Sequence, residues 1–391
     1  MPGAMTHAQV KPMRRGRAER GVRRRPSQRD IAKALGLSAS TVSLVVGGSH
    51  SHLRSRLSEE TVRRIQGKAE ELGYIPNGAA QTMRRGQTNL IVLLNMGGYS
   101  EVCARQAYHV GREVREAGFD FQNVDAFWWS DDGQRIVEQV LALHPLGIIL
   151  TGAPQTKMDF ARFERAHIPV VAIGPDFPGV RRVLFNIHAA FRTLTEHCIT
   201  TGRRRIALLL GASNNPNFHS KERKSGFLEA LAAHGWPTPA TFPVGGPLPS
   251  LSSLPPEAPF ACIFERETRF QFFDYFSAGR KSAAWFGTFP DAIICANDFD
   301  ATGVLSWMLQ NGVRVPEEVA VSGFDNYSFA TEGAVSLTTV AQPNEELSVT
   351  AVRLLNDLIA GNARQEDAIE MLPCKVLWRQ SLPAAETHPG V

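Results

Sequence analysis

Residues 38–46, with the sequence SASTVSLVV, carry hydroxyl groups in a pattern suited to contacts with DNA. They follow an arginine-rich stretch and have the pattern of a short helix, but their polar positions hold only Ser and Thr. Proteins usually read base edges in the major groove with Arg, Asn or Gln. Small hydroxyl groups suit phosphate oxygens, which position a protein without specifying sequence. The stretch therefore predicts a DNA-contacting helix that makes few polar contacts with bases.

A second set of polar side chains lies further along the chain, at the ends of expected strands or the starts of the helices that follow. The guanidinium of Arg223 in ERKSGF can bind hydroxyls or a carboxylate through two hydrogen bonds. Asp325 in GFDN can accept hydrogen bonds, and Asn297 in CAND can donate and accept them. The full set is Tyr99, Thr151, Asp176, Arg223, Asn297 and Asp325. These residue types predict a site for a small polar molecule.

The hydroxyl-bearing helix is expected to be the second of three in a small all-α head over residues 26–74. Ser27 can cap the first helix, with Asp30 reaching back as in a capping box, and Gly36 can end it. Ser38 can cap the second helix, and a third follows. Two short helices joined by such a turn form a helix-turn-helix, which in a basic segment favours DNA binding over a generic helical bundle.

The charge of the chain is unevenly distributed, although the net charge is only +4. Residues 1–88 contain 17 Lys and Arg against 6 Asp and Glu, and the remainder contains 25 against 32. Residues 1–25 hold 8 of those 17 basic residues and are expected to be a disordered leader. A basic first quarter on an acidic remainder indicates a polyanion-binding head on a body that does not bind polyanions.

The body, residues 89–385, alternates strand and helix patterns. Strands are expected at 90–95, 119–127, 147–152, 168–174, 205–211, 289–298 and 315–325, and helices at 101–117, 134–143, 159–166, 196–202 and 301–312. This alternation is typical of doubly wound parallel sheets, and two such sets predict two lobes with a cleft between them. Ligands of such folds bind at the carboxyl ends of the strands.

Several classes of protein are excluded by missing signals. No apolar run is long enough to span a membrane, and the basic N-terminal residues lack the apolar core of a secretory signal. The five scattered cysteines fit reduced thiols in the cytoplasm, and neither a disulfide framework nor a metal site is expected. No Walker loop, G-x-S-x-G elbow or dinucleotide fingerprint is present, so neither an enzyme nor a cofactor is expected.

The chain resembles the LacI/GalR (lactose-repressor) family of transcription regulators over nearly its whole length. The head matches in RDIAKALGLSASTVSLVVGG and LSEETVRRIQGKAEELGYIPNGAAQTMRRGQT. The body matches in GRRRIALLLG, RKSGF, DAIICANDFDATGVL, VPEEVAVSGFDN and LTTVAQPNEELSVTAVRLLNDLIAG. The resemblance implies a repressor with a periplasmic-binding-protein-like body, acting as a homodimer or a dimer of dimers on double-stranded operator DNA. It further implies that a small effector, a sugar or related metabolite, controls DNA affinity. A solute-binding protein with the same two lobes is the alternative function.

The resemblance assigns roles in the head and in a hinge at residues 75–88. Ser38, Thr41 and Ser43 match positions near phosphates, whereas Ala39, Ser40 and Leu44 would face the major groove. In the hinge, Asn77, Ala80 and Gln81 match the family, Met83 would be the minor-groove wedge and Arg84 would lie beside phosphates. The DNA-contacting set is Ser27, Arg29, Ser38, Ala39, Ser40, Thr41, Ser43, Leu44, Asn77, Ala80, Gln81, Met83 and Arg84. Without the resemblance, a plain flexible linker is the simpler interpretation of the hinge.

The resemblance also implies three crossings between the lobes, near Ile187, Ala341 and Glu370. Lobe 1 would comprise about 89–187 and 341–370, and lobe 2 about 188–340 and 371–385. Phe185 matches an aromatic residue of the family's pocket and joins the effector-binding set.

Three features depart from the family or stay open. Asn186 and Ile187 replace a common Asp-Asn pair, so the effector contact made there is not carried over. The loop GSHSHLRSR is longer than usual and is either a source of DNA backbone contacts or a solvated loop. Trp128 and Trp129 either pack in a core or dimer interface or stack on a sugar.

Overall fold

A computed structural model describes residues 26–46, 57–75, 88–97, 100–126, 133–152, 158–174, 177, 179–212, 218–243, 259–266, 280 and 290–385. The chain divides into two compact units, Met1–Thr88 and Asn89–Val391. Some predictions fall outside the described residues: those on the leader, on the loop at 48–56, on Asn77, Ala80, Gln81, Met83 and Arg84, and on Tyr99, Trp128, Trp129 and Asp176.

The first unit contains the three predicted helices, α1 (Gln28–Leu35), α2 (Ala39–Val46) and α4 (Glu59–Glu71). Their start signals act as expected: the Asp30 carboxylate accepts hydrogen bonds from the N–H and the hydroxyl of Ser27, both at 2.7 Å. Gly36 ends α1 with φ 66°, a conformation that glycine adopts without steric cost. Ile31, Val42 and Ile65, one from each helix, are fully buried and form the centre of the core.

The second unit begins with a six-stranded parallel sheet in the order β12-β5-β4-β3-β1-β2. Its strands are β1 (Leu90–Asn95), β2 (Asp120–Asp125), β3 (Gly147–Thr151), β4 (Val170–Ile173), β5 (Arg181–Phe185) and β12 (Ile369–Leu372). Alternate residues of β1 point to opposite faces: Ile91 and Leu93 pack with α6 (Glu101–Glu116) and α13 (Asn344–Ile359). Val92 and Leu94 pack with α7 (Gly133–Ala142) and α8 (Ala161–Arg165). Helices on both faces make this lobe doubly wound, as predicted.

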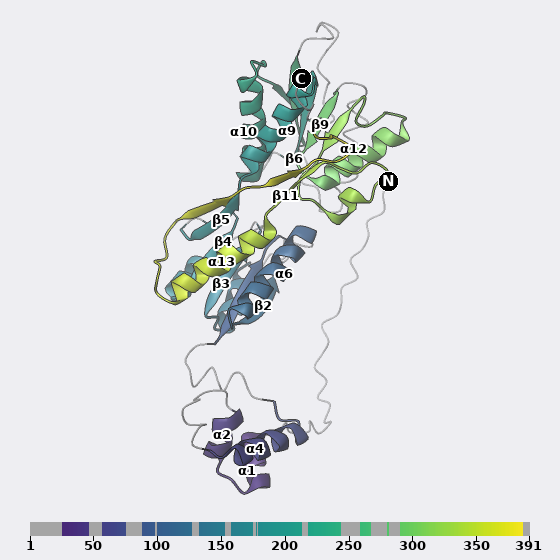
Figure 1. The fold of residues 1–391 in the computed structure, drawn as a ribbon. Helices are drawn as coiled ribbons and strands as arrows, with labels where there is room; N and C mark the ends of the chain where they lie inside the picture. The colour runs from purple at the N-terminus through teal and green to yellow at the C-terminus, as the bar shows by residue number, and fades with distance from the viewer. Residues whose placement is uncertain are drawn as a thin grey trace, which may run out of the picture. The chain divides into compact units, whose positions relative to one another are not determined.

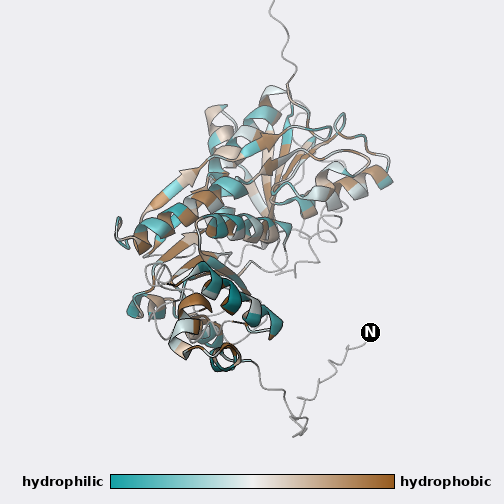
Figure 2. Cartoon of the chain, turned by 60° about the horizontal axis from the view of Figure 1, so that its bottom comes forward, coloured by the Kyte–Doolittle hydropathy of each residue, from teal (hydrophilic) through white to brown (hydrophobic). Residues whose placement is uncertain are grey.

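The second lobe repeats the arrangement around a five-stranded parallel sheet in the order β10-β9-β6-β8-β7. The strands are β6 (Arg205–Ala212), β7 (Ala240–Pro243), β8 (Phe260–Arg266), β9 (Ala292–Cys295) and β10 (Ala320–Ser322). Ile206 and Leu208 face α9 (Ile187–Thr200) and α10 (Phe218–Ala233), whereas Ala207 and Leu209 face α12 (Asp298–Gln310). Figure 1 shows these two layered lobes, and Figure 2 shows the mixed hydropathy of the helices that cover the strands.

The lobes are joined by three crossings. The first runs from β5 into α9 at Asn186, whose side chain accepts the N–H of Ala189 at 2.9 Å and so caps the helix. The second follows β11 (Thr339–Ala341), which pairs antiparallel with β13 (Lys375–Leu377). The third lies between β12 and β13. The expected crossing near Glu370 therefore comes slightly too early, because Glu370 is still within β12 and paired with β5.

No helix among the described residues is long and apolar enough to cross a membrane.

Candidate functional site

The surface of the head carries the predicted hydroxyl groups close together. Ser38 accepts the N–H of Thr41 at 3.0 Å, which caps α2, and its hydroxyl lies 2.7 Å from the hydroxyls of Ser40 and Thr41. Arg29, Ala39 and Ser40 are exposed, whereas Ser43 and Leu44 are partly buried. Leu44 thus contributes only part of its side chain to the surface. The exposed start of α2 is a cluster of small hydroxyls, as the sequence predicted.

In the body, three predicted residues from distant parts of the chain meet at the boundary between the lobes. Phe185 ends β5, Arg223 comes from α10 and Asp325 follows β10. The structure adds Phe191, His219 and Phe324. We call these six residues the interlobe cluster: Phe185, Phe191, His219, Arg223, Phe324 and Asp325.

Aromatic rings hold the guanidinium of Arg223 in place. Its central carbon lies 5.1 Å from the ring centroid of Phe324 and 5.7 Å from that of Phe191, the geometry of cation–π contacts. Phe185 stacks on Phe324 with centroids 6.2 Å apart and lies 5.6 Å from the ring of His219. Burial and the neighbouring Arg223 lower the pKa of His219 to about 3, so this imidazole is neutral at physiological pH. The cluster therefore combines one fixed cation with apolar ring faces.

Asp325 supplies the opposing charge. Its side chain accepts a hydrogen bond from Gln342 at 2.6 Å, and its N–H donates to the carbonyl of Val340 at 2.9 Å. Burial raises the pKa of Asp325 to about 6, although Arg223, the bond from Gln342 and Arg105 act to lower it. The carboxyl is thus mostly ionised at pH 7 and can accept hydrogen bonds from a hydroxylated ligand.

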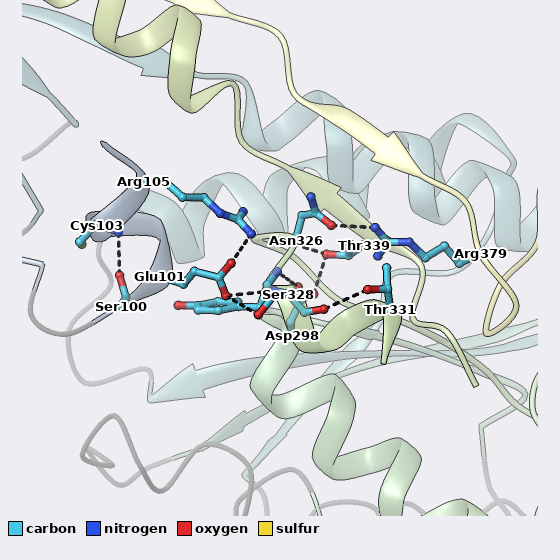
Figure 3. Close-up of polar contacts among 11 residues, drawn as sticks. Ser100, Glu101, Cys103, Arg105, Asp298, Asn326, Ser328, Thr331, Thr339 and Arg379 are labelled. Atoms are coloured by element: carbon cyan, nitrogen blue, oxygen red, sulfur yellow. Dashed lines mark hydrogen bonds and ion pairs between the residues drawn. The ribbon is translucent and has the colours of Figure 1, made fainter. Parts of the chain in front are cut away.

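The backbone that presents Asp325 is strained and firmly anchored. Asp325 and Asn326 have φ values of 107° and 50°, in a region that side-chain-bearing residues rarely adopt. Asp298, which is fully buried, accepts the N–H of Tyr327 at 2.8 Å and the hydroxyl of Thr339 at 2.5 Å. These bonds hold the turn that follows β10, which we define as residues 323–328 and call the receptor turn (Figure 3).

Two further features fix the receptor turn. Arg379 donates to the side chain of Asn326 at 2.8 Å. A Cβ on Gly323 would lie 2.2 Å from Oδ1 of Asp298, so only glycine allows this close approach. The pKa of Asp298 is raised to about 8, mainly by burial and also by the charge of Asp325, whereas the hydrogen bond from Thr339 acts to lower it.

Two predicted effector residues have structural contacts instead of joining the cluster. Thr151 is buried and donates its hydroxyl to Gln106 at 2.5 Å. Asn297 caps α12 by accepting the N–H of Asp300 at 2.9 Å. A separate hollow of about 270 Å³ between α12 and residues 329–337 contains none of the predicted site residues.

The residues that the sequence did not single out had only weak signals. Phe324 directly precedes Asp325, and His219 lies one helical turn before Arg223 on the same helix. Both could have been predicted as neighbours of these two site residues. Phe191 lies on α9, after the first crossing, and Gln342 directly follows β11 at the second. No local sequence pattern places either residue at the cluster.

Three family models match the chain. The model described as bacterial regulatory proteins, lacI family, matches residues 28–77. The model of periplasmic binding proteins and the sugar binding domain of the LacI family matches residues 105–241. A periplasmic binding protein-like domain matches residues 195–382. Together the three matches cover the head and most of the body.

Individual relatives agree with these models. The chain is 24% identical to the HTH-type transcriptional repressor PurR of Aliivibrio salmonicida over 359 residues, covering 90% of this chain and 98% of the relative. It is 28% identical to the HTH-type transcriptional regulator CelR of Thermobifida fusca, covering 88% and 94%. A structure of the lac repressor dimer bound to operator and an anti-inducer shares the fold, with a TM-score of 0.71, 21% identity and coverage of 92% and 100%. This chain belongs to the LacI family of bacterial regulatory proteins.

Proposed function

We propose that the protein is a cytoplasmic transcriptional repressor that binds operator DNA as a homodimer or a dimer of dimers. A small polar effector, a sugar or a related metabolite, would bind at the interlobe cluster and control the affinity for DNA. The observation that carries this proposal is the combination of a helix-turn-helix head with a fixed Arg223 and an ionised Asp325 at the boundary of two lobes. Among relatives of the same fold, CelR has been solved with cellobiose and the lac repressor with operator.

Different parts of the chain would carry out different steps of this function. Residues 26–74 would contact the major groove, residues 75–88 would form the hinge and residues 89–385 would bind effector and dimerise. The match of residues 28–77 to a regulatory head argues against the alternative of a solute-binding protein. The family consists of DNA-binding regulators rather than enzymes, and we infer no catalytic activity for this chain.

A salt series tests DNA binding. In gel shifts with duplex DNA, a head that neutralises several phosphates gives an affinity that falls steeply with salt, with a log–log slope of about −0.9 for each phosphate contacted. We expect this behaviour for the full chain. Failure to bind any duplex at low salt would overturn the proposal.

A thermal-shift screen tests the effector site. We expect one class among sugars, sugar phosphates and nucleobases to raise the melting temperature, because a ligand that binds only the folded state stabilises it. The shift should disappear in Asp325→Asn and persist in the surface variant Glu317→Gln. A ligand that stabilises all three proteins equally binds elsewhere.

A further inference from the structure

One contact between the lobes lies away from the three crossings. Glu101 is in the first turn of α6 in lobe 1, and Ser328 begins η2 (Ser328–Thr331), which belongs to lobe 2. One carboxylate oxygen of Glu101 accepts the N–H of Ser328 at 3.0 Å and its hydroxyl at 3.1 Å. The two residues are 227 positions apart in the sequence, so the bonds join separate lobes directly (Figure 3).

The lobe 1 side of this contact is prepared to accept hydrogen bonds. The other carboxylate oxygen of Glu101 pairs with Arg105, one turn along the same helix. Burial alone raises the pKa of Glu101, but the bonds from Ser328 and the charge of Arg105 outweigh it and lower the pKa below its usual value. Glu101 is therefore a charged acceptor, and hydrogen bonds to charged groups are stronger than those between neutral groups.

The lobe 2 side is rigid. Ser328 ends the receptor turn, which Asp298, Thr339 and Arg379 fasten to lobe 2. The same turn presents Asp325 to the interlobe cluster, and the charge of Arg105 acts on that carboxyl from lobe 1. Movement of lobe 1 away from the turn would break the bonds between Glu101 and Ser328 and weaken the attraction between Arg105 and Asp325.

We infer that Glu101 is a positioning residue for the interlobe site, because it holds lobe 1 against the receptor turn. Phe185 is only 7% exposed and Phe324 is fully buried, whereas Arg223 and Asp325 are partly buried, so access to the cluster widens when the lobes separate. The Glu101–Ser328 contact sets how often they do so. An effector that enters must then either displace this contact or allow it to re-form around the bound molecule.

Two variants remove the contact from opposite sides. Glu101→Ala deletes the acceptor. Ser328→Pro deletes both donors and suits the backbone, because Tyr327 has φ −63° and ψ 153°, as a residue before proline requires, and proline is tolerated at the first position of a helix. Glu345→Gln is the matched control, since Glu345 is also a first-turn acid but pairs with Arg112 within lobe 1.

The readout is the distance between the lobes of the full-length chain without ligand. Glu164 of lobe 1 and His234 of lobe 2 are both exposed. Spin labels on cysteines introduced at these two positions report the distance by double electron–electron resonance spectroscopy. Four native cysteines are buried, and Cys374→Ser removes the fifth. Diluting labelled chains with unlabelled ones suppresses signals between protomers.

We expect Glu101→Ala and Ser328→Pro to raise the population of longer distances about fivefold, since losing a partly solvated charged hydrogen bond changes an equilibrium by that order. Glu101→Gln, which keeps one acceptor oxygen, should lie between Glu101→Ala and the parent. Glu345→Gln should match the parent. Unchanged distances in both Glu101→Ala and Ser328→Pro would overturn the inference. That result would leave the proposed DNA binding untouched, because the measurement involves neither DNA nor effector.

Discussion

At the scale of single residues, the two acids of the receptor turn region differ in what burial does to them. Asp325 lies beside Arg223 and Gln342, and these contacts limit the rise of its pKa to about 6. Asp298 is fully buried, and burial together with the charge of Asp325 raises its pKa to about 8, although Thr339, Tyr327 and Arg379 act to lower it. The first acid can therefore serve a ligand as a charged acceptor, whereas the second serves the fold.

The raised pKa of Asp298 predicts a dependence of stability on pH. The folded chain holds the proton up to about pH 8, whereas the unfolded chain releases it near the usual value of 3.8. The free energy of unfolding should therefore fall as pH rises from about 4 to about 8, by at most ~1.4 kcal/mol per pH unit, and then level off. Urea unfolding at a series of pH values, with Asp298→Asn as reference, isolates this group. A difference between the two proteins that does not vary with pH contradicts the assignment.

Leu44 carries a prediction about DNA sequence. Its side chain is only partly buried and lies one helical turn after the exposed Ser40 on α2. Apolar groups favour thymine methyls, whereas arginine favours guanine. Leu44→Arg should thus change the preferred base within a half-site while duplex binding persists, as measured by selection from a random DNA pool. The same selected site for Leu44→Ala and the parent would show that Leu44 reads no base.

At the scale of elements, the receptor turn depends on close packing between Gly323 and Asp298. In Gly323→Ala, the new Cβ would lie 2.2 Å from Oδ1 of Asp298 and 3.1 Å from the Cα of Asp298. The loss should be about 1–3 kcal/mol in unfolding free energy, the usual cost of overpacking. Gly333→Ala is the control, because its nearest atom would be 3.4 Å away, an ordinary contact. Equal melting temperatures for the two variants would argue that the turn adapts.

The elements also show what a sequence can and cannot predict. Helix α2 was predictable because its cap at Ser38 and its apolar positions Val42 and Val45 are local signals. Seven of the eleven strands in the two sheets, β1, β2, β3, β4, β6, β9 and β10, were predicted from the sequence, whereas β5, β7, β8 and β12 were not. The third lobe crossing was placed too early, since Glu370 and its partner strand are far apart in sequence and only the pairing of β12 with β5 reveals it. Phe191 was missed for the same reason: it packs against Phe324, which is far away in the sequence.

At the scale of the whole molecule, effector and operator must influence each other through the chain that joins their sites. If effector changes the affinity for DNA by some factor, operator changes the affinity for effector by the same factor, because the two bindings share one thermodynamic cycle. We expect this factor to lie between about 5 and 150, the usual range of allosteric coupling. Fluorescence titrations of effector with and without operator, and of operator with and without effector, measure it twice. Glu101→Ala should change the factor, because it alters the lobe closure on which the coupling depends, whereas Glu345→Gln should leave it unchanged. Two titrations that give different factors for the same protein would mean that a third component, such as a change in oligomeric state, takes part in the cycle.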